Sequence, residues 1–133
     1  MKYSNVVVAG GGVLGSQIAF QAAYCGFNVT IWLRSEGSIG RTQPKIDHLK
    51  QTYIEAIEKM AEDKNAWCAG LADEDTFDKE ECLKKVENAY ANLKLELDMA
   101  KAVADADLVI ESMAENEKDK IAFYEKLGFE MAF

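Results

Sequence analysis

A glycine-rich turn placed between an apolar run and an apolar helix constrains the fold of this chain more than any other feature. Residues 6–33 read VVVAGGGVLGSQIAFQAAYCGFNVTIWL, which predicts a strand, a turn, a helix and a second strand in that order. Gly10, Gly12 and Gly15 occupy the three glycine positions of the pattern G-x-G-x-x-G. Two strands joined through a helix are typical of a parallel sheet that helices cover.

Each glycine of this turn has a distinct physical task. The first permits a tight turn, the second lets the backbone approach a pyrophosphate, and the third lets the helix pack closely on its strand. The helix that follows points its unpaired N–H groups and the positive end of its dipole at the turn, which favours an anionic diphosphate. We therefore predict that a dinucleotide binds at residues 10–15, namely Gly10, Gly11, Gly12, Val13, Leu14 and Gly15. The alternative is a glycine turn that only joins packed elements.

The predicted helix after the turn is apolar on more than one face. One stripe at helical spacing and a second set of apolar residues indicate that a sheet or neighbouring helices cover it. Gly26 stands where a C-terminal cap belongs. The stripe is Leu14, Ile18, Ala22 and Cys25, and the second set is Ala19, Phe20 and Ala23.

Composition narrows the class of protein and of partner. The chain has 133 residues, of which 49% are hydrophobic and 29% charged, as expected for one soluble domain with its own core. The formal net charge of −8 argues against nucleic acid and anionic membranes as partners. Cys25, Cys68 and Cys82 are odd in number and lack metal-ligand spacing, which favours free thiols in a reducing compartment, the cytoplasm, and no metal site.

The middle of the chain predicts a helical hairpin. Residues 34–47 are polar and contain the single proline, so we expect a loop that ends at a helix start at Pro44. A helix over residues 44–63 follows from apolar residues spaced by three and four, and a second helix is expected from Asp75 to about Asn88, with Lys84 and Lys85 near its end. The predicted hairpin thus spans about residues 44–90. The apolar stripe of the first helix is Ile46, Leu49, Tyr53, Ala56 and Met60.

The remaining elements complete an open sheet with four parallel strands. Residues 93–98 alternate between apolar and polar and predict an edge strand. Residues 98–105 predict a short helix, and residues 108–110 predict an interior strand. Asn116 is expected to cap a last helix that ends at Gly128.

Two segments carry a resemblance to a known family. GGGVLGSQIAFQAAYCGFNVT at residues 10–30 and DADLVIESMAENEKDKIAFYEKLG at residues 105–128 resemble 3-hydroxyacyl-CoA dehydrogenases, and GVLGSQIAFQ is especially similar to their diketoreductase branch. The resemblance covers nearly all of residues 5–128. It implies an α/β fold, a Rossmann-type doubly wound, mostly parallel sheet with a helical hairpin insertion. It also implies an oxidoreductase of fatty acid metabolism that passes hydride between a 3-hydroxyacyl-CoA and a nicotinamide cofactor.

The resemblance also assigns two polar residues near the C-terminus. It implies that Glu115 and Lys120 lie beside the nicotinamide ribose. Glu115 follows the carboxyl end of a predicted strand, where open α/β sheets place ligands. The alternatives are that both residues belong to a solvated helix start, or that Glu111 is the polar group that matters.

The chain departs from the family pattern after the second strand. Members usually end this strand with an aspartate that accepts hydrogen bonds from the adenosine ribose, but Leu33 stands at the matching position. Arg34 and Ser35 follow directly and Arg41 is near, which is the kind of replacement that accommodates a 2′-phosphate. NAD and NADP therefore both remain candidates. There are two alternatives to this assignment. Arg34 is an ordinary exposed basic residue, or Glu36 holds the ribose.

The C-terminal end is the second departure. The family continues into a strand, a serine-bearing loop, a histidine paired with glutamate, and a helical domain that completes the acyl-CoA site and the dimer, whereas this chain stops at LGFEMAF. We therefore expect a fold that is incomplete relative to the family, with one dinucleotide-binding domain over residues 1–133, no catalytic residues, and an acyl-CoA substrate and homo-oligomer only in the full-length enzyme. His48 is expected to be a solvated surface residue. The alternatives are a non-catalytic dinucleotide-binding module, a truncated or frame-shifted product, or a different Rossmann reductase.

Overall fold

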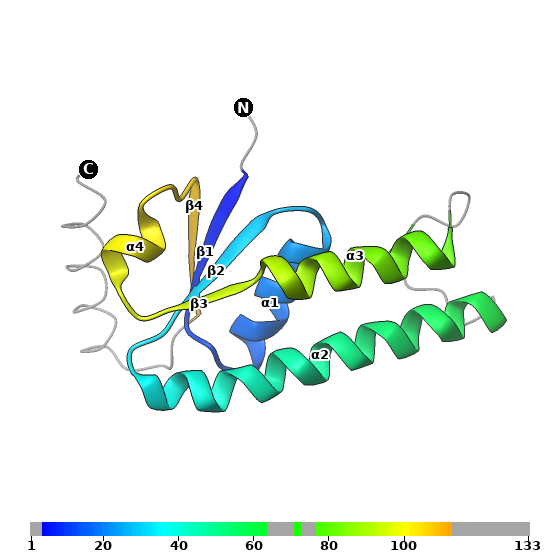
Figure 1. The fold of residues 1–133 in the computed structure, drawn as a ribbon, viewed down its shortest axis with the longest axis horizontal. Helices are drawn as coiled ribbons and strands as arrows, with labels where there is room; N and C mark the ends of the chain where they lie inside the picture. The colour runs from blue at the N-terminus through cyan, green and yellow to red at the C-terminus, as the bar shows by residue number, and fades with distance from the viewer. Residues whose placement is uncertain (1–3, 64–70, 73–76, 113–133) are drawn as a thin grey trace.

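The described part of the chain forms a four-stranded parallel sheet with helices on both faces. A computed structural model describes residues 4–63, 71–72 and 77–112. The strands are β1 (Asn5–Ala9), β2 (Asn28–Trp32), β3 (Lys94–Glu96) and β4 (Leu108–Glu111), in the spatial order β3-β2-β1-β4 (Figure 1). This order matches the first four strands of the Rossmann order 3-2-1-4-5-6, and it confirms the predicted open α/β sheet.

All four strands end at the same edge of the sheet. β1 pairs with β2 from Asn5–Asn28 to Ala9–Trp32 and with β4 from Val6–Leu108 to Ala9–Glu111. Backbone hydrogen bonds continue past the strands, from Gly10 N to the carbonyl of Trp32 at 3.0 Å and from Ser112 N to that of Ala9 at 2.9 Å. The segments that follow β1, β2 and β4 are therefore fixed side by side at the carboxyl edge.

Alternate residues of β1 face two separate cores. Val6 and Val8 belong to the larger core, where the sheet meets α1 (Val13–Tyr24), α2 (Glu36–Glu62) and α3 (Lys79–Asn92). Val7 and Ala9 face the smaller core, formed with α4 (Met99–Val103) on the other side of the sheet. Because side chains alternate along a strand, this division confirms that the sheet is covered on both faces.

The helix that begins at Glu36 corrects the predicted loop. Ser35 caps α2 by accepting a hydrogen bond from Ser38 N at 3.3 Å, so residues 36–43 are helical and Pro44 lies inside the helix. Ser, Thr, Asp and Asn are preferred at helix caps because their side chains accept from the otherwise unpaired first-turn N–H groups. The predicted apolar stripe is confirmed in part, since Ile46 and Met60 are buried.

The partner helix α3 begins later than predicted and also ends later. Asp78 caps it by accepting from Glu81 N at 3.2 Å, and the helix continues to Asn92. Lys84 and Lys85 consequently lie in its middle, not near its end. α2 and α3 run side by side, and they begin and end at Glu36 and Asn92, beyond both ends of the predicted hairpin of residues 44–90 (Figure 1).

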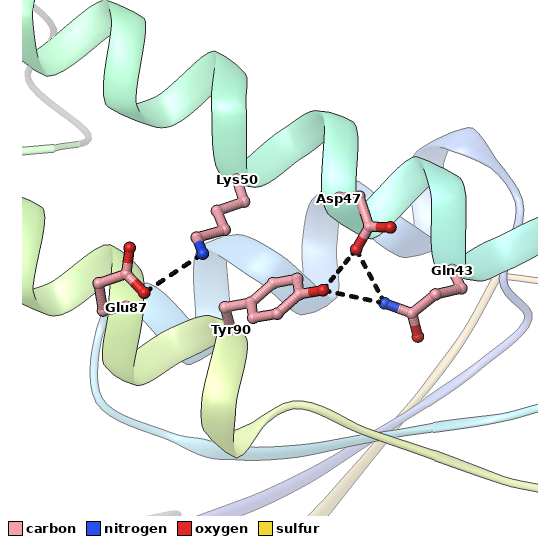
Figure 2. A network of polar contacts seen from close by, with 5 residues as sticks. All are labelled: Gln43, Asp47, Lys50, Glu87 and Tyr90. Carbon is pink, nitrogen blue, oxygen red and sulfur yellow. Dashed lines mark hydrogen bonds and ion pairs between the residues drawn. The ribbon is translucent and has the colours of Figure 1, made fainter.

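Polar contacts connect α2 with α3 along their exposed side. Tyr90 donates its hydroxyl hydrogen to Asp47 Oδ1 at 2.6 Å, and Lys50 Nζ lies 3.2 Å from Glu87 Oε2 (Figure 2). Lys50 Nζ also lies 4.5 Å from the centre of the Tyr90 ring. Residues 47 and 50 of α2 thus meet residues 90 and 87 of α3, the pairing of two antiparallel helices.

The other sequence predictions have mixed outcomes. The edge strand β3 is confirmed, and Asp98 caps the expected short helix α4 by accepting from Ala100 N at 2.9 Å. β4 is confirmed as a strand with the apolar pattern of an interior one, and among the described residues it lies at the edge of the sheet, with Leu108 42% exposed. The predicted last helix lies outside the described residues, as does Cys68.

The buried face of α1 is offset from the predicted stripe. Leu14 and Cys25 are exposed, whereas Ala19, Phe20 and Ala23 are buried. Leu14 lies in the first turn of α1 and belongs to neither core. Among the described helices, none combines the length and the apolar character that a membrane span requires.

Candidate functional site at the carboxyl edge of the sheet

A cavity of about 440 Å³ lies at the carboxyl edge of the sheet. It opens beside β1 and β4, where the strand order reverses, which is the place where open α/β sheets bind ligands. Segments from β1, β2, β4, α1 and α2 form its wall. The wall residues are Gly10, Gly11, Gly12, Val13, Leu14, Gly15, Trp32, Leu33, Arg34, Ser38, Arg41, Thr42, Lys45 and Ser112.

The three glycines of the predicted pattern occupy three different environments. Gly10 has a φ of 115°, a left-handed conformation that glycine adopts without steric cost. A Cβ on Gly15 would meet the carbonyl oxygen of Gly10, so only glycine lets α1 start this close to the end of β1. A Cβ on Gly12 would have nothing within 4 Å, because this residue borders the open cavity.

Gly11 has a structural role that the sequence pattern did not predict. A Cβ there would lie 2.7 Å from Leu33 Cδ2 and would also meet the Thr42 side chain. The carbonyl of Gly11 accepts hydrogen bonds from Ser16 Oγ at 3.1 Å, Thr42 Oγ1 at 3.2 Å and Lys45 Nζ at 3.4 Å. The turn is thus fastened to both α1 and α2.

The start of α1 offers backbone donors to the cavity. Gly12 is its N-cap and brings no side-chain acceptor, and no acidic residue stands in the first turn. The first N–H groups of a helix have no partner within the helix and carry part of its positive dipole. Val13 and Leu14, 66% and 63% exposed, add an apolar surface at the same rim.

The segment after β2 supplies positive charge. Leu33 is buried, with 3% of its surface exposed, and Arg34 follows it at the rim. Arg41 and Lys45 reach the same wall from α2. Ser35 is not a wall residue because its side chain caps α2, and Ser38, one turn into the helix, lines the cavity instead.

The wall of the cavity is cationic although the chain is acidic. Among the wall residues that the structure describes, three are cations and none is a carboxylate, against a net charge of −8 for the whole chain. Positive side chains, helix N–H groups and apolar residues around one cavity suit a ligand that carries both phosphates and flat rings.

Thr42, Lys45, Ser38 and Ser112 are wall residues that sequence reasoning missed. Ser38 and Thr42 fall in the segment predicted to be a loop, so their approach to the turn depends on the unexpected first turns of α2, whereas Lys45 lies in the predicted helix. Ser112 follows β4, and no sequence pattern marked it as a site residue. The sequence carried one usable signal, the capping serine at position 35.

The remaining predicted site residues are placed as follows. Glu115 and Lys120 lie outside the described residues. Glu111 ends β4 and is half-buried, but Ser112 is the wall residue from that segment. His48 is exposed, as predicted, and lines a separate hollow of about 290 Å³ with Pro44. The described residues contain no cluster of side chains suited to a metal ion.

Comparison with known proteins gives one family. Residues 5–131 match the family model described as the NAD-binding domain of 3-hydroxyacyl-CoA dehydrogenase. The mitochondrial hydroxyacyl-coenzyme A dehydrogenase of Rattus norvegicus is 29% identical over 123 residues, which cover 92% of this chain and 34% of that protein. A probable 3-hydroxyacyl-CoA dehydrogenase of Caenorhabditis elegans is 28% identical, with 86% of this chain and 32% of that protein covered. The chain therefore spans about a third of the length of these relatives.

Solved structures show the same similarity. A diketoreductase that acts on dicarbonyl compounds is 33% identical with a TM-score of 0.75, and the alignment covers 98% of this chain and 38% of that one. The (S)-3-hydroxybutyryl-CoA dehydrogenase of Ralstonia eutropha has a TM-score of 0.68 at 18% identity, over 95% of this chain and 36% of that one. The second similarity is one of fold.

Proposed function

Because this chain belongs to the 3-hydroxyacyl-CoA dehydrogenase family, as part of its NAD-binding domain, we propose that it holds the nicotinamide dinucleotide of a 3-hydroxyacyl-CoA dehydrogenase. The complete enzyme would pass hydride between a 3-hydroxyacyl-CoA and this cofactor. The observation that carries the proposal is the cavity at the carboxyl edge, which brings the glycine turn, the start of α1 and the cations after β2 to one place.

Each part of the wall has a proposed role in binding. The pyrophosphate would lie over Gly12, within reach of the first N–H groups of α1. Val13 and Leu14 would contact the apolar parts of the cofactor, and the residues after β2 would hold the adenosine ribose. Glu115 and Lys120 stay predictions for the nicotinamide ribose.

The described wall holds and orients a cofactor, and we propose that proton transfer depends on other residues. When bound, the nicotinamide ring supplies the hydride chemistry. The wall residues of the described ranges include no histidine, aspartate, glutamate or cysteine to act as a general base. The general base, the rest of the acyl-CoA site and any homo-oligomer contact are thus proposed to belong to the full-length enzyme.

Two finer assignments belong to the proposal. The cofactor is NAD or NADP, and the residues that distinguish them are those after β2. A cytoplasmic location stays a prediction from the free thiols Cys25 and Cys82, while the matched rat relative is mitochondrial.

The first test is calorimetric titration of the chain with NADH and with NADPH, alongside Gly12→Val. Since a Cβ at Gly12 has nothing within 4 Å, the variant should fold, yet its branched side chain would occupy the space of the pyrophosphate. We expect dinucleotide affinity to fall by about a hundredfold or more, the loss of a closely approached phosphate group.

Gly40→Val is the matched control. Gly40 also has nothing within 4 Å of a Cβ, but it lies on α2 away from the cavity wall. It should bind the dinucleotide as the unaltered chain does. Unchanged affinity in a folded Gly12→Val chain would contradict the proposed site.

A further inference from the structure

We propose that this cavity selects NADP over NAD, through a subsite for the 2′-phosphate formed by Arg34, Ser38 and Arg41. The inference rests on the proposed function, since it specifies the dinucleotide that the same cavity would hold. All three residues belong to the wall, two of them from the first turns of α2 and one from the segment between β2 and α2.

Because Leu33 stands where the family usually has an aspartate, the carboxylate that would favour NAD is absent from this position. A ribose with a free 2′-hydroxyl is held by a carboxylate near the end of the second strand, and that carboxylate repels a 2′-phosphate. Leu33 is the residue directly after β2, and its Cδ2 lies 2.7 Å from an ideal Cβ position on Gly11. Its buried side chain therefore packs on the glycine turn and brings no negative charge to the cavity wall.

Arg41 is held against the first turn of α2, at the wall of the same cavity. Its Nη2 donates a hydrogen bond to Ser38 Oγ at 3.0 Å, and its Nη1 lies 3.3 Å from an ideal Cβ position on Gly37. The guanidinium therefore folds back over the first turn of α2. A guanidinium has five N–H donors, so the bond to Ser38 leaves others for an anion.

Ser38 connects this guanidinium to the cap of the helix. Its Oγ lies 3.1 Å from Ser35 Oγ, while its backbone N–H donates to the same oxygen. Arg41, Ser38 and Ser35 thus form a chain of contacts that fixes the direction of the arginine. A fixed fork loses less side-chain freedom on binding a phosphate than a free one.

Arg34 is a second guanidinium of the same cavity wall, directly before the cap Ser35 in the sequence. It is exposed and belongs to the cavity wall, one residue after Leu33. Each guanidinium can bind a phosphate through two parallel N–H donors, and the wall offers two guanidinium groups. Lys45 stands apart from this pair, since its Nζ lies 3.4 Å from the carbonyl of Gly11 and hence nearer the pyrophosphate position.

Glu36 is an acidic residue directly after the cap Ser35. It lies in the first turn of α2, is exposed, and is not a wall residue. A glutamate that faced the ribose would favour NAD instead, so Glu36→Gln separates the two assignments.

The experiment is calorimetric titration of the 133-residue chain with NADPH, NADH, 2′,5′-ADP and 5′-AMP. We expect NADPH to bind at least tenfold more tightly than NADH, and 2′,5′-ADP more tightly than 5′-AMP. Arg34→Ala and Arg41→Ala should each lower NADPH affinity by about tenfold to a hundredfold, the range for a hydrogen bond to a charged group, and change NADH affinity less than about twofold. Lys84→Ala, which removes an exposed cation outside the wall, should leave both affinities unchanged.

The outcomes separate the inference from the proposed function. Equal affinity for NADPH and NADH, or arginine variants that weaken both affinities alike, would overturn the 2′-phosphate subsite. The proposed dinucleotide binding would not be affected by either result. Loss of NADH binding in Glu36→Gln would assign the ribose to Glu36 and also overturn it. A folded chain that binds no probe would overturn the proposed function and the inference together.

Discussion

At the scale of single residues, Gly12 and Gly15 of the turn have different surroundings. Gly12 borders open space, whereas a Cβ on Gly15 would meet the carbonyl oxygen of Gly10. The backbone of the turn has no flexible side-chain end that can move aside at that contact. We therefore propose that Gly12 matters to a ligand, whereas Gly15 matters to the fold itself.

We predict that Gly15→Ala destabilises the folded chain. The added methyl group would force α1 away from the end of β1, and overpacking of this kind costs about 1–3 kcal/mol of unfolding free energy. Urea denaturation followed by circular dichroism would measure it. Gly12→Ala, with open space around its new methyl group, is the matched control, and equal stabilities of the two variants would contradict the role assigned to Gly15.

The pattern of three glycines was readable from sequence, but the contacts of Gly11 were not. The pattern reflects local backbone geometry, which residues 10–15 determine among themselves. Gly11 instead meets Leu33, Thr42 and Lys45, more than twenty residues away along the chain. Contacts of that kind depend on where α2 lies, so the spacing of residues within one segment of the sequence cannot predict them.

At the scale of elements, the polar contacts between α2 and α3 couple the hairpin to pH (Figure 2). The hydrogen bonds from Tyr90 and then Gln43 lower the pKa of Asp47 from its ordinary value of 3.8. The same bond to Asp47 raises the pKa of Tyr90 above its ordinary value of 10.0. The charged carboxylate and the neutral phenol are thus the forms that connect the two helices.

The two shifts define a pH window for this contact. The contribution of Asp47 is present above pH 3.8, its unfolded value, and is lost as the pH falls through its lower folded pKa. The contribution of Tyr90 is present below pH 10.0 and is lost as the pH rises through its higher folded pKa. The hairpin contact is therefore fully formed between these values.

We predict that Tyr90→Phe raises the pKa of Asp47 toward 3.8, because the variant removes the largest cause of the shift. The carboxyl carbon of Asp47, followed by NMR through an acid titration, would report it. Tyr53→Phe is the control, since the Tyr53 hydroxyl donates to Gln21 at 2.6 Å and does not contact Asp47. An unchanged Asp47 pKa in Tyr90→Phe would mean that the bond contributes nothing in solution.

The start of α2 shows where sequence patterns lead to the wrong element. Gly37, Gly40 and Pro44 are poor helix formers, and together they predicted a loop. The structure overrides that preference because Ser35 caps the helix and Thr42, 2% exposed, packs against the turn. Tertiary contacts outweighed local propensity at the segment that forms one wall of the cavity. The strands and α4 were predicted well because their apolar patterns and the Asp98 cap act locally.

At the scale of the whole molecule, the cavity draws residues from most of the described elements. β1, β2 and β4 supply the floor through the segments that follow them, and α1 and α2 supply the walls. The cavity exists only when these elements are assembled, so a ligand bound there favours the folded chain over the unfolded one.

We predict that the preferred dinucleotide raises the thermal unfolding midpoint of the chain. At a ligand concentration of about one hundred times Kd the stabilisation is about 2.7 kcal/mol, which corresponds to roughly 10 °C for a domain of this size. Differential scanning calorimetry with and without NADPH or NADH would measure the shift.

Two variants show whether that shift depends on the cavity. Gly12→Val should remove it, because the ligand no longer binds, while leaving the midpoint of the ligand-free chain nearly unchanged. Ile57→Val should do the reverse, because Ile57 is fully buried in the larger core away from the cavity wall. It should lower the ligand-free stability by about 0.5–1.5 kcal/mol and keep the full ligand shift. A shift that survived in Gly12→Val would mean that the dinucleotide stabilises the chain from another place on its surface.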